Sequence, residues 1–281
     1  MSSELSTGLL PAVGKIDSRL PIGIFDSGFG GLTVSRAVTD LLPHEDIIYL
    51  GDTARAPYGP RTIAEVRKFA LEGLDWLMDQ GVKALVVACN SASSAALRDI
   101  RERYSVPVVD VIIPAARRAA KITRNGRVGV ISTTATDKSG AYFDALAASN
   151  VRLYSKPCPR FVEFVEEGIT SGDEVLEVTR EYLQPLKEKN VDTLILGCTH
   201  YPLLSGAISY VMGEEVALVS SSDECARSAF AILTKIEGLR DAEPDRSAGH
   251  RFFTTGDPSK FAGLGSRLVG DFVSRVEKAE L

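Results

Sequence analysis

The chain has 281 residues, of which 44% are hydrophobic and 25% are charged, and its formal net charge is −5. This length allows one large or two ordinary globular domains, each with a core of its own. The 32 Lys and Arg residues stand against 37 Asp and Glu residues and form no dense basic cluster, which argues against nucleic acid as the primary ligand.

The first 18 residues contain Glu4 and a short apolar run that Pro11 interrupts, so they do not form a secretory signal. We expect a flexible tail over residues 1–18. No apolar run approaches the roughly 20 residues of a membrane span, and we expect a cytoplasmic protein with no membrane partner. The four cysteines form no C-x-x-C pair, which favours free thiols over a metal or redox centre.

Short runs rich in Val, Ile and Leu alternate with segments of helical period along the rest of the chain. Several runs are apolar on both faces, as strands covered by helices on each side must be. We expect strands at 21–26, 46–52, 84–90, 106–112, 127–133, 193–199 and 215–221, and weaker ones at 151–157 and 251–257. This alternation predicts the α/β class with doubly wound, mainly parallel sheets.

The clearest helix is expected over residues 61–81. Its apolar stripe consists of Ile63, Val66, Ala70, Gly73/Leu74 and Leu77, and Gly81 stands at the expected C-terminal cap.

The two halves of the chain resemble each other. Residues 84–97 align with 193–208, an apolar strand followed by a cysteine and a helix, and the two cysteines are 198 − 89 = 109 positions apart. Residues 21–33 pair with 127–142, and aligning Asp26 with Ile131 gives an offset of 105. We therefore expect two pseudo-symmetric α/β units. Because ligands bind beyond the carboxyl ends of parallel strands, both cysteines would face one cleft between the units.

Cys89 and Cys198 each end an apolar strand and precede a residue suited to cap a helix. The positive end of a helix dipole lowers the pKa of a nearby thiol, which makes a thiolate accessible. Two thiols on opposite sides of one cleft suit the inversion of a carbon stereocentre. One thiolate removes a proton from one face, and the other thiol delivers a proton to the opposite face.

Polar residues next to these strands could assist the two cysteines in proton transfer or in binding the substrate. His200 could exchange a proton with Cys198 or bind a substrate carboxylate. Asp26 could orient Cys89 or pair with a substrate ammonium, or it could simply cap a helix. The loop 51–62 is expected beside the site, where it presents Tyr58.

An amphipathic helix is predicted over residues 161–168. By spacing, its apolar residues Phe161, Val162, Phe164 and Val165 belong to the core. The helix also carries the acids Glu163, Glu166 and Glu167. We expect most of these side chains to be solvated, and periodicity by itself does not mark any of them as functional.

Four motifs in this order closely resemble the glutamate racemases of the aspartate/glutamate racemase superfamily: DSGFGGLTV, GDTARAPYGPRT, ACNSAS and LGCTHYPLL. The likeness extends over about residues 20–222. It implies two pseudo-symmetric α/β domains, 19–112 with 223–281 and 113–222, with the active site between them. It also implies an isomerase that interconverts L- and D-glutamate for peptidoglycan synthesis without a cofactor or metal. We expect a homodimer.

The resemblance also implies residue roles. Cys89 would deprotonate the D-enantiomer with help from Asp26, and Cys198 the L-enantiomer with help from His200 and Glu166. The positions that match substrate-binding segments are Asp26, Ser27, Tyr58, Gly59, Asn90, Ser91, Thr133, Thr136, Thr199 and His200.

Two residues depart from the family pattern. Ser91 replaces a threonine and retains the hydroxyl. Ala135 replaces a glycine and would restrict the backbone if the turn required a positive φ.

Alternatives remain open at this point. They are an aspartate or hydantoin racemase of the same superfamily, a non-catalytic binding module, and a cysteine hydrolase that uses the Cys198–His200 pair.

Overall fold

Two parallel sheets form the framework of this computed structural model, which describes residues 16–243, 246–273 and 275–281. The first sheet has the order β10-β9-β2-β1-β3-β4, and the second has the order β6-β5-β7-β8. The strands are β1 (Ile22–Asp26), β2 (Ile47–Gly51), β3 (Ala84–Val87), β4 (Val108–Asp110), β5 (Arg127–Ser132), β6 (Arg152–Pro157), β7 (Thr193–Gly197), β8 (Ala217–Ser220), β9 (Arg251–Thr254) and β10 (Val276–Lys278).

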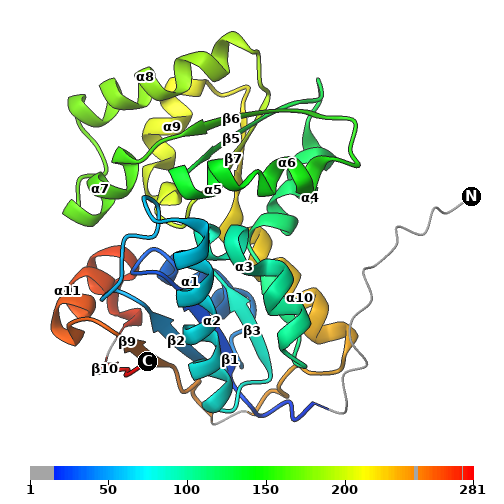
Figure 1. Ribbon diagram of the computed structural model, residues 1–281, viewed down its shortest axis with the longest axis vertical. Helices are drawn as coiled ribbons and strands as arrows, with labels where there is room; N and C mark the ends of the chain where they lie inside the picture. The colour runs from blue at the N-terminus through cyan, green and yellow to red at the C-terminus, as the bar shows by residue number, and fades with distance from the viewer. Residues whose placement is uncertain (1–15, 244–245, 274) are drawn as a thin grey trace, which may run out of the picture.

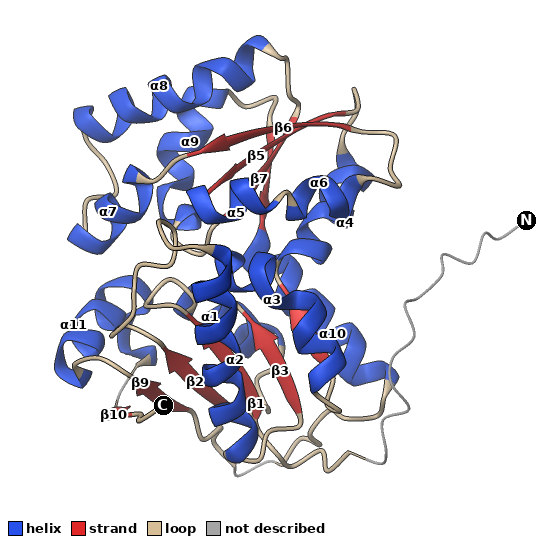
Figure 2. Cartoon of the chain, viewed as in Figure 1, coloured by secondary structure: helices blue, strands red, loops and turns tan. Residues whose placement is uncertain are grey.

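Helices cover both sheets, and the two units lie one above the other (Figures 1 and 2). The helices are α1 (Leu32–Leu41), α2 (Ile63–Asp79), α3 (Asn90–Arg103), α4 (Ile112–Ile122), α5 (Thr134–Ser139), α6 (Ala141–Leu146), α7 (Arg160–Glu167), α8 (Asp173–Glu188), α9 (Ser205–Met212), α10 (Ser221–Lys235) and α11 (Pro258–Val269), with the 3-10 turns η1 (Tyr201–Leu204) and η2 (Gly270–Phe272). The predicted α/β class is confirmed. None of the helices in the described ranges combines the length and hydropathy that crossing a bilayer requires.

The sheets share one topology. In the first unit the order β2-β1-β3-β4 matches β6-β5-β7-β8 in the second, so the predicted pseudo-symmetry is confirmed. The registers correct one detail of the alignment. Phe25 pairs with Val87, two residues before Cys89, and Ile131 pairs with Leu196, two residues before Cys198. The equivalent of Ile131 is therefore Phe25, at an offset of 131 − 25 = 106, and not Asp26.

Both weaker strand candidates are present, as β6 and β9. The short β10 was not predicted. Its three residues, Val276–Lys278, include two charged ones and lie at the edge of the sheet, so they show no buried apolar pattern.

The helix α2 begins with a capping box between Thr62 and Glu65. The predicted stripe is buried except for Ile63, which is 39% exposed in the first turn, so that assignment was wrong. Gly73 allows close packing, because a Cβ there would lie 2.3 Å from the Phe25 ring. Gly81 adopts φ +73° directly after the helix, as expected of a glycine cap.

One hydrophobic cluster runs through both units: it contains Ile22 and Val86 of the first sheet and Val128 and Ile195 of the second. The helices α4 and α10 contact elements of both units. The domain boundaries at 112/113 and 222/223 therefore stay predictions. Of the predicted tail, residues 1–15 lie outside the described residues, and the Ser18 carbonyl accepts a hydrogen bond from Lys83.

Candidate active site

A cleft of about 370 Å³ lies where the carboxyl ends of both sheets meet. Four strands deliver residues to it: Ser27 follows β1, Cys89 follows β3, Thr133 follows β5, and Cys198 follows β7. It is lined by Ser27, Gly28, Ala56, Pro57, Tyr58, Gly59, Pro60, Cys89, Asn90, Ser91, Thr133, Thr134, Pro159, Val162, Glu163, Glu166, Cys198, Thr199 and His200. The two predicted cysteines therefore share one cavity.

Cys89 occupies the N-cap of α3, where the Ala92 amide donates to its sulfur at 3.4 Å. Its thiol donates to Ser27 Oγ, also at 3.4 Å. Burial and, secondly, the Asp26 carboxylate raise the pKa of Cys89 to about 12, although hydrogen bonds between Cys89 and its neighbours Ser27 and Ala92 oppose this shift. The expectation that the helix terminus lowers this pKa was wrong, because the desolvation of a buried thiolate has a larger effect on the pKa than the hydrogen bond from the helix amide. Cys89 is a thiol at neutral pH.

Asp26 lies behind the cleft wall at 1% exposure and does not line the cavity. The Gly28 amide donates to its Oδ1 at 2.9 Å, which supports the turn that carries Ser27. The alternative assignment as a helix cap is wrong for α1, whose N-cap is Gly31. Burial raises the pKa of Asp26, against the opposing effects of His200 and of the Gly31 and Gly28 amides.

Cys198, His200 and Glu166 form a chain of contacts on the opposite side. Cys198 Sγ lies 3.7 Å from His200 Nδ1, and His200 Nε2 lies 3.4 Å from Glu166 Oε1. Burial by itself lowers the pKa of His200, but Cys198 and Glu166 together raise it to about 10. The imidazole is therefore protonated at neutral pH and can serve as a proton donor next to Cys198.

Hydroxyl groups from both units meet at the base of the cleft. Ser91 Oγ lies 2.9 Å from Thr133 Oγ1 and 3.4 Å from Thr136 Oγ1. Thr136 itself does not line the cavity, and it supports Thr133 from behind at 3.1 Å. The serine at position 91 thus retains a hydroxyl contact across the interface. Ala135 lies inside α5 and does not adopt a positive φ, so an alanine causes no backbone strain at this position.

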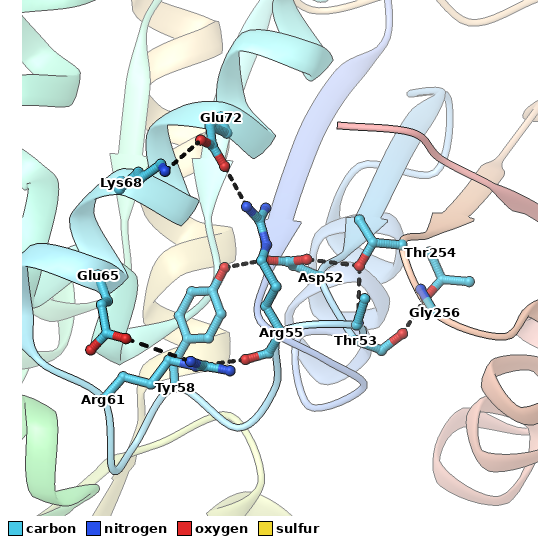
Figure 3. A network of polar contacts seen from close by, with 12 residues as sticks. Asp52, Thr53, Arg55, Tyr58, Arg61, Glu65, Lys68, Glu72, Thr254 and Gly256 are labelled. Carbon is cyan, nitrogen blue, oxygen red and sulfur yellow. Dashed lines mark hydrogen bonds and ion pairs between the residues drawn. The ribbon is translucent and has the colours of Figure 1, made fainter.

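The loop 52–62 reaches from the first unit toward α5 and α7 (Figure 1). Its Gly59 carbonyl accepts a hydrogen bond from the Ala135 amide at 2.9 Å, which joins the two units. Tyr58 lines the cleft, but it is 1% exposed and its hydroxyl donates to Asp52, which does not line the cleft (Figure 3). Asp52 also accepts from Arg55, at 2.6 Å. The Tyr58–Gly59 segment can therefore meet a ligand mainly through its backbone.

Sequence reasoning missed several lining residues, of which Val162 and Glu163 on α7 are the most informative. Val162 was expected in the core, but it is only partly buried and faces the cleft. Glu163 stands one helical turn before Glu166, so both acids share one face of α7. This spacing was visible in the sequence, but it does not reveal which face meets the cleft.

None of the described residues that line the cleft is Lys or Arg, and its charged side chains are Glu163, Glu166 and His200. An anionic ligand must therefore be held mainly by hydroxyls, amides and the protonated His200. The arrangement can place a small, polar ligand between a thiol on one wall and a thiol with an imidazole partner on the other.

Comparisons with known proteins agree with this geometry. Residues 32–229 match the family model described as Asp/Glu/Hydantoin racemase. A glutamate racemase from Parafrankia sp. is 59% identical over 263 residues, which cover 93% of this chain and 95% of that protein.

Two solved structures are similar along nearly their whole length. The crystal structure of a glutamate racemase isoform from Bacillus anthracis has a TM-score of 0.90 at 41% identity, covering 94% of this chain and 98% of that one. The glutamate racemase from Francisella tularensis in complex with D-glutamate has a TM-score of 0.86 at 37% identity, with the same coverage of 94% and 98%.

Proposed function

This chain belongs to the Asp/Glu/hydantoin racemase family, and on that premise we propose that it is a glutamate racemase that works with two thiols and no cofactor. One observation carries the proposal: Cys89 and Cys198 follow equivalent strands of two equivalent sheets and line the same cleft. Two acid–base groups placed in this way can address opposite faces of one Cα. A cysteine hydrolase would have no use for the second thiol.

In the direction from L to D, the Cys198 thiolate removes the Cα proton of L-glutamate. The electron pair of the broken C–H bond stays on the substrate as a carbanion, which the α-carboxylate delocalises. Cys89 then delivers its proton to the opposite face, which gives D-glutamate and leaves Cys89 as the thiolate. The raised pKa of Cys89 keeps its proton in place until the carbanion forms.

His200 is the proton partner of Cys198 in this proposal. With its pKa raised to about 10, the imidazole carries a positive charge 3.7 Å from the sulfur, and this charge offsets the negative charge on the sulfur when Cys198 acts as the base. Glu166 Oε1 lies 3.4 Å from the other imidazole nitrogen, and its negative charge favours the charged form of His200. In the reverse direction Cys89 must ionise, and the substrate ammonium can offset the cost of a buried thiolate.

Substrate carboxylates are held in this proposal by Asn90, the Ser91–Thr133 hydroxyl pair and Thr199, together with backbone amides of the loops around Ser27 and Gly59. Neutral donors suit this task because they bind a carboxylate without neutralising the acid–base groups nearby. The relatives named above are glutamate racemases, which favours glutamate over aspartate or a hydantoin.

The test is racemisation of L- and D-glutamate in D₂O, followed by circular dichroism and by NMR of the Cα proton. We expect each enantiomer to convert to the other with uptake of one solvent deuteron at Cα. Cys198→Ser and Cys89→Ser should each abolish racemisation at an unchanged melting temperature. Full racemase activity of either variant would refute the two-thiol mechanism, and turnover of aspartate alone would refute the substrate assignment.

We further propose that the protein supplies D-glutamate for peptidoglycan synthesis in the cytoplasm, where a reducing environment keeps its four cysteines as thiols. The expected homodimer stays a prediction, which analytical ultracentrifugation tests directly.

A further inference from the structure

Tyr142, on α6 of the second unit, reaches across to the first unit. It is 3% exposed, and its hydroxyl donates to Asn90 Oδ1 at 2.8 Å. Asn90 is the first residue of α3 and directly follows Cys89. A buried side chain of one unit thus contacts the loop that carries the thiol of the other.

The ring of Tyr142 also contacts the second thiol loop. A Cβ placed on Gly197, the residue before Cys198, would lie 3.0 Å from Tyr142 Cε2. The ring therefore lies directly against the Gly197 backbone. Tyr142 contacts the neighbours of both cysteines, although it does not itself line the cleft.

The hydrogen bond fixes which end of the Asn90 amide is free. Since Oδ1 accepts from Tyr142, the Nδ2 amine carries the remaining donors. Nδ2 is buried and has no hydrogen-bond partner among the residues that the structure describes, and Asn90 lines the cleft. A buried amine without a partner is unfavourable, so the amide is ready to donate to a ligand.

We propose that Tyr142 is a positioning residue for substrate binding. Its hydroxyl holds the Asn90 amide with Nδ2 toward a carboxylate of the substrate, in a cleft whose lining includes no Lys or Arg among the described residues. This inference rests on the proposed racemase function. Tyr142 acts only through Asn90, while its ring maintains the packing against Gly197.

The test is Tyr142→Phe, which removes the hydroxyl and retains the ring. We expect KM for both glutamate enantiomers to rise by about three- to tenfold, as for the loss of one substrate hydrogen bond, with kcat changed by less than about twofold. Tyr104→Phe is the matched control, because the Tyr104 hydroxyl also donates to a side chain, Asp75, but lies outside the cleft. The control should lower the melting temperature and leave KM unchanged.

A double-mutant cycle separates positioning from general destabilisation. If Tyr142 acts through Asn90, Tyr142→Phe should change KM by less than about twofold in an Asn90→Ala background. An equal proportional rise of KM in both backgrounds, or an unchanged KM in the single variant, would overturn the proposal. Racemisation by the wild type is measured first, so that its absence counts against the proposed function and not against the role of Tyr142.

A second variant covers the case in which Tyr142→Phe does not fold. Asn90→Asp retains the acceptor for the Tyr142 hydroxyl but replaces the free donor by a carboxylate oxygen. Repulsion between this carboxylate and the substrate carboxylate should then raise KM above that of Asn90→Ala. A KM for Asn90→Asp at or below that of Asn90→Ala would contradict the predicted orientation of the amide.

Discussion

Gly30 lies in the turn after β1, and its contacts make a sharp prediction for Gly30→Ala. A Cβ at this position would lie 2.3 Å from Thr199 Oγ1 and 2.6 Å from His200 Nδ1. Both contacts cross from the first unit to the second. An added methyl therefore enters the space that the partners of Cys198 occupy.

The displacement follows from the distances. Ordinary van der Waals contact begins at 3.4 Å, so Thr199 Oγ1 must move by 3.4 − 2.3 = 1.1 Å and His200 Nδ1 by 3.4 − 2.6 = 0.8 Å. A shift of about 1 Å in a group that takes part in the chemistry costs on the order of a hundredfold in rate. We expect kcat/KM to fall by about that factor. Because the two enantiomers have equal energy, kcat/KM must fall equally in both directions.

The assay is racemisation of each enantiomer, combined with thermal unfolding. Gly206→Ala on α9 is the matched control, because a Cβ there meets nothing within 4 Å, and it should leave kcat/KM unchanged. If Gly30→Ala retains more than half of the wild-type kcat/KM, the close approach does not fix the position of His200, and the reasoning is refuted.

Three further predictions concern charge. Glu166→Gln removes the carboxylate 3.4 Å from His200 Nε2 and should lower the pKa of His200 by about one to three pH units, measured by NMR titration of the ring; an unchanged pKa would contradict the contact. Asp26→Asn removes a buried carboxyl group, and burial raises the pKa of this group. Since the folded state binds this proton more tightly than the unfolded state, the ionised form is destabilising. The free energy of unfolding of the variant should therefore be about 1 kcal/mol higher than that of the wild type at pH 7, and this difference should disappear as the pH falls toward 4. The kcat/KM of the variant should drop. Urea unfolding of variant and wild type at several pH values tests this prediction. A stability difference that grows as the pH falls would contradict it. Lys83→Met leaves Glu45 buried without its partner at 2.5 Å and should destabilise the fold by about 3–5 kcal/mol, whereas the double variant with Glu45→Leu should recover most of the loss.

Local patterns in the sequence were sufficient to predict the framework. Runs apolar on both faces mark the buried parallel strands, and even the weaker run at 151–157 is a strand. The repeated strand-and-cysteine pattern predicts that Cys89 and Cys198 occupy equivalent places. The short edge strand β10 lacks such a pattern, because an edge strand with charged residues buries little apolar surface.

The roles of individual side chains were less predictable, because they depend on which neighbours surround them. The motif around Tyr58 predicts a loop beside the site, but only the position of Asp52 turns the tyrosine hydroxyl away from the cleft. The amphipathic pattern of α7 predicts a buried face, yet Val162 at its margin faces the cavity.

The pKa of Cys89 illustrates the same limit. Its place before a helix is visible in the sequence and predicts a lowered pKa. Its burial, and the Asp26 carboxylate nearby, are properties of the assembled fold, and they raise the pKa to about 12.

By itself the sequence determined the α/β class, the pseudo-repeat, and the pair of cysteines at equivalent strand ends, because each follows from the periodicity of single segments or from the likeness between two segments. Only the tertiary structure decided how the two halves meet. The contacts of Gly30 with His200 and of Tyr142 with Asn90 join residues that are more than 50 positions apart, as 200 − 30 = 170 and 142 − 90 = 52 show. Such contacts arise when two separately patterned units pack together, and no pattern within either unit encodes them.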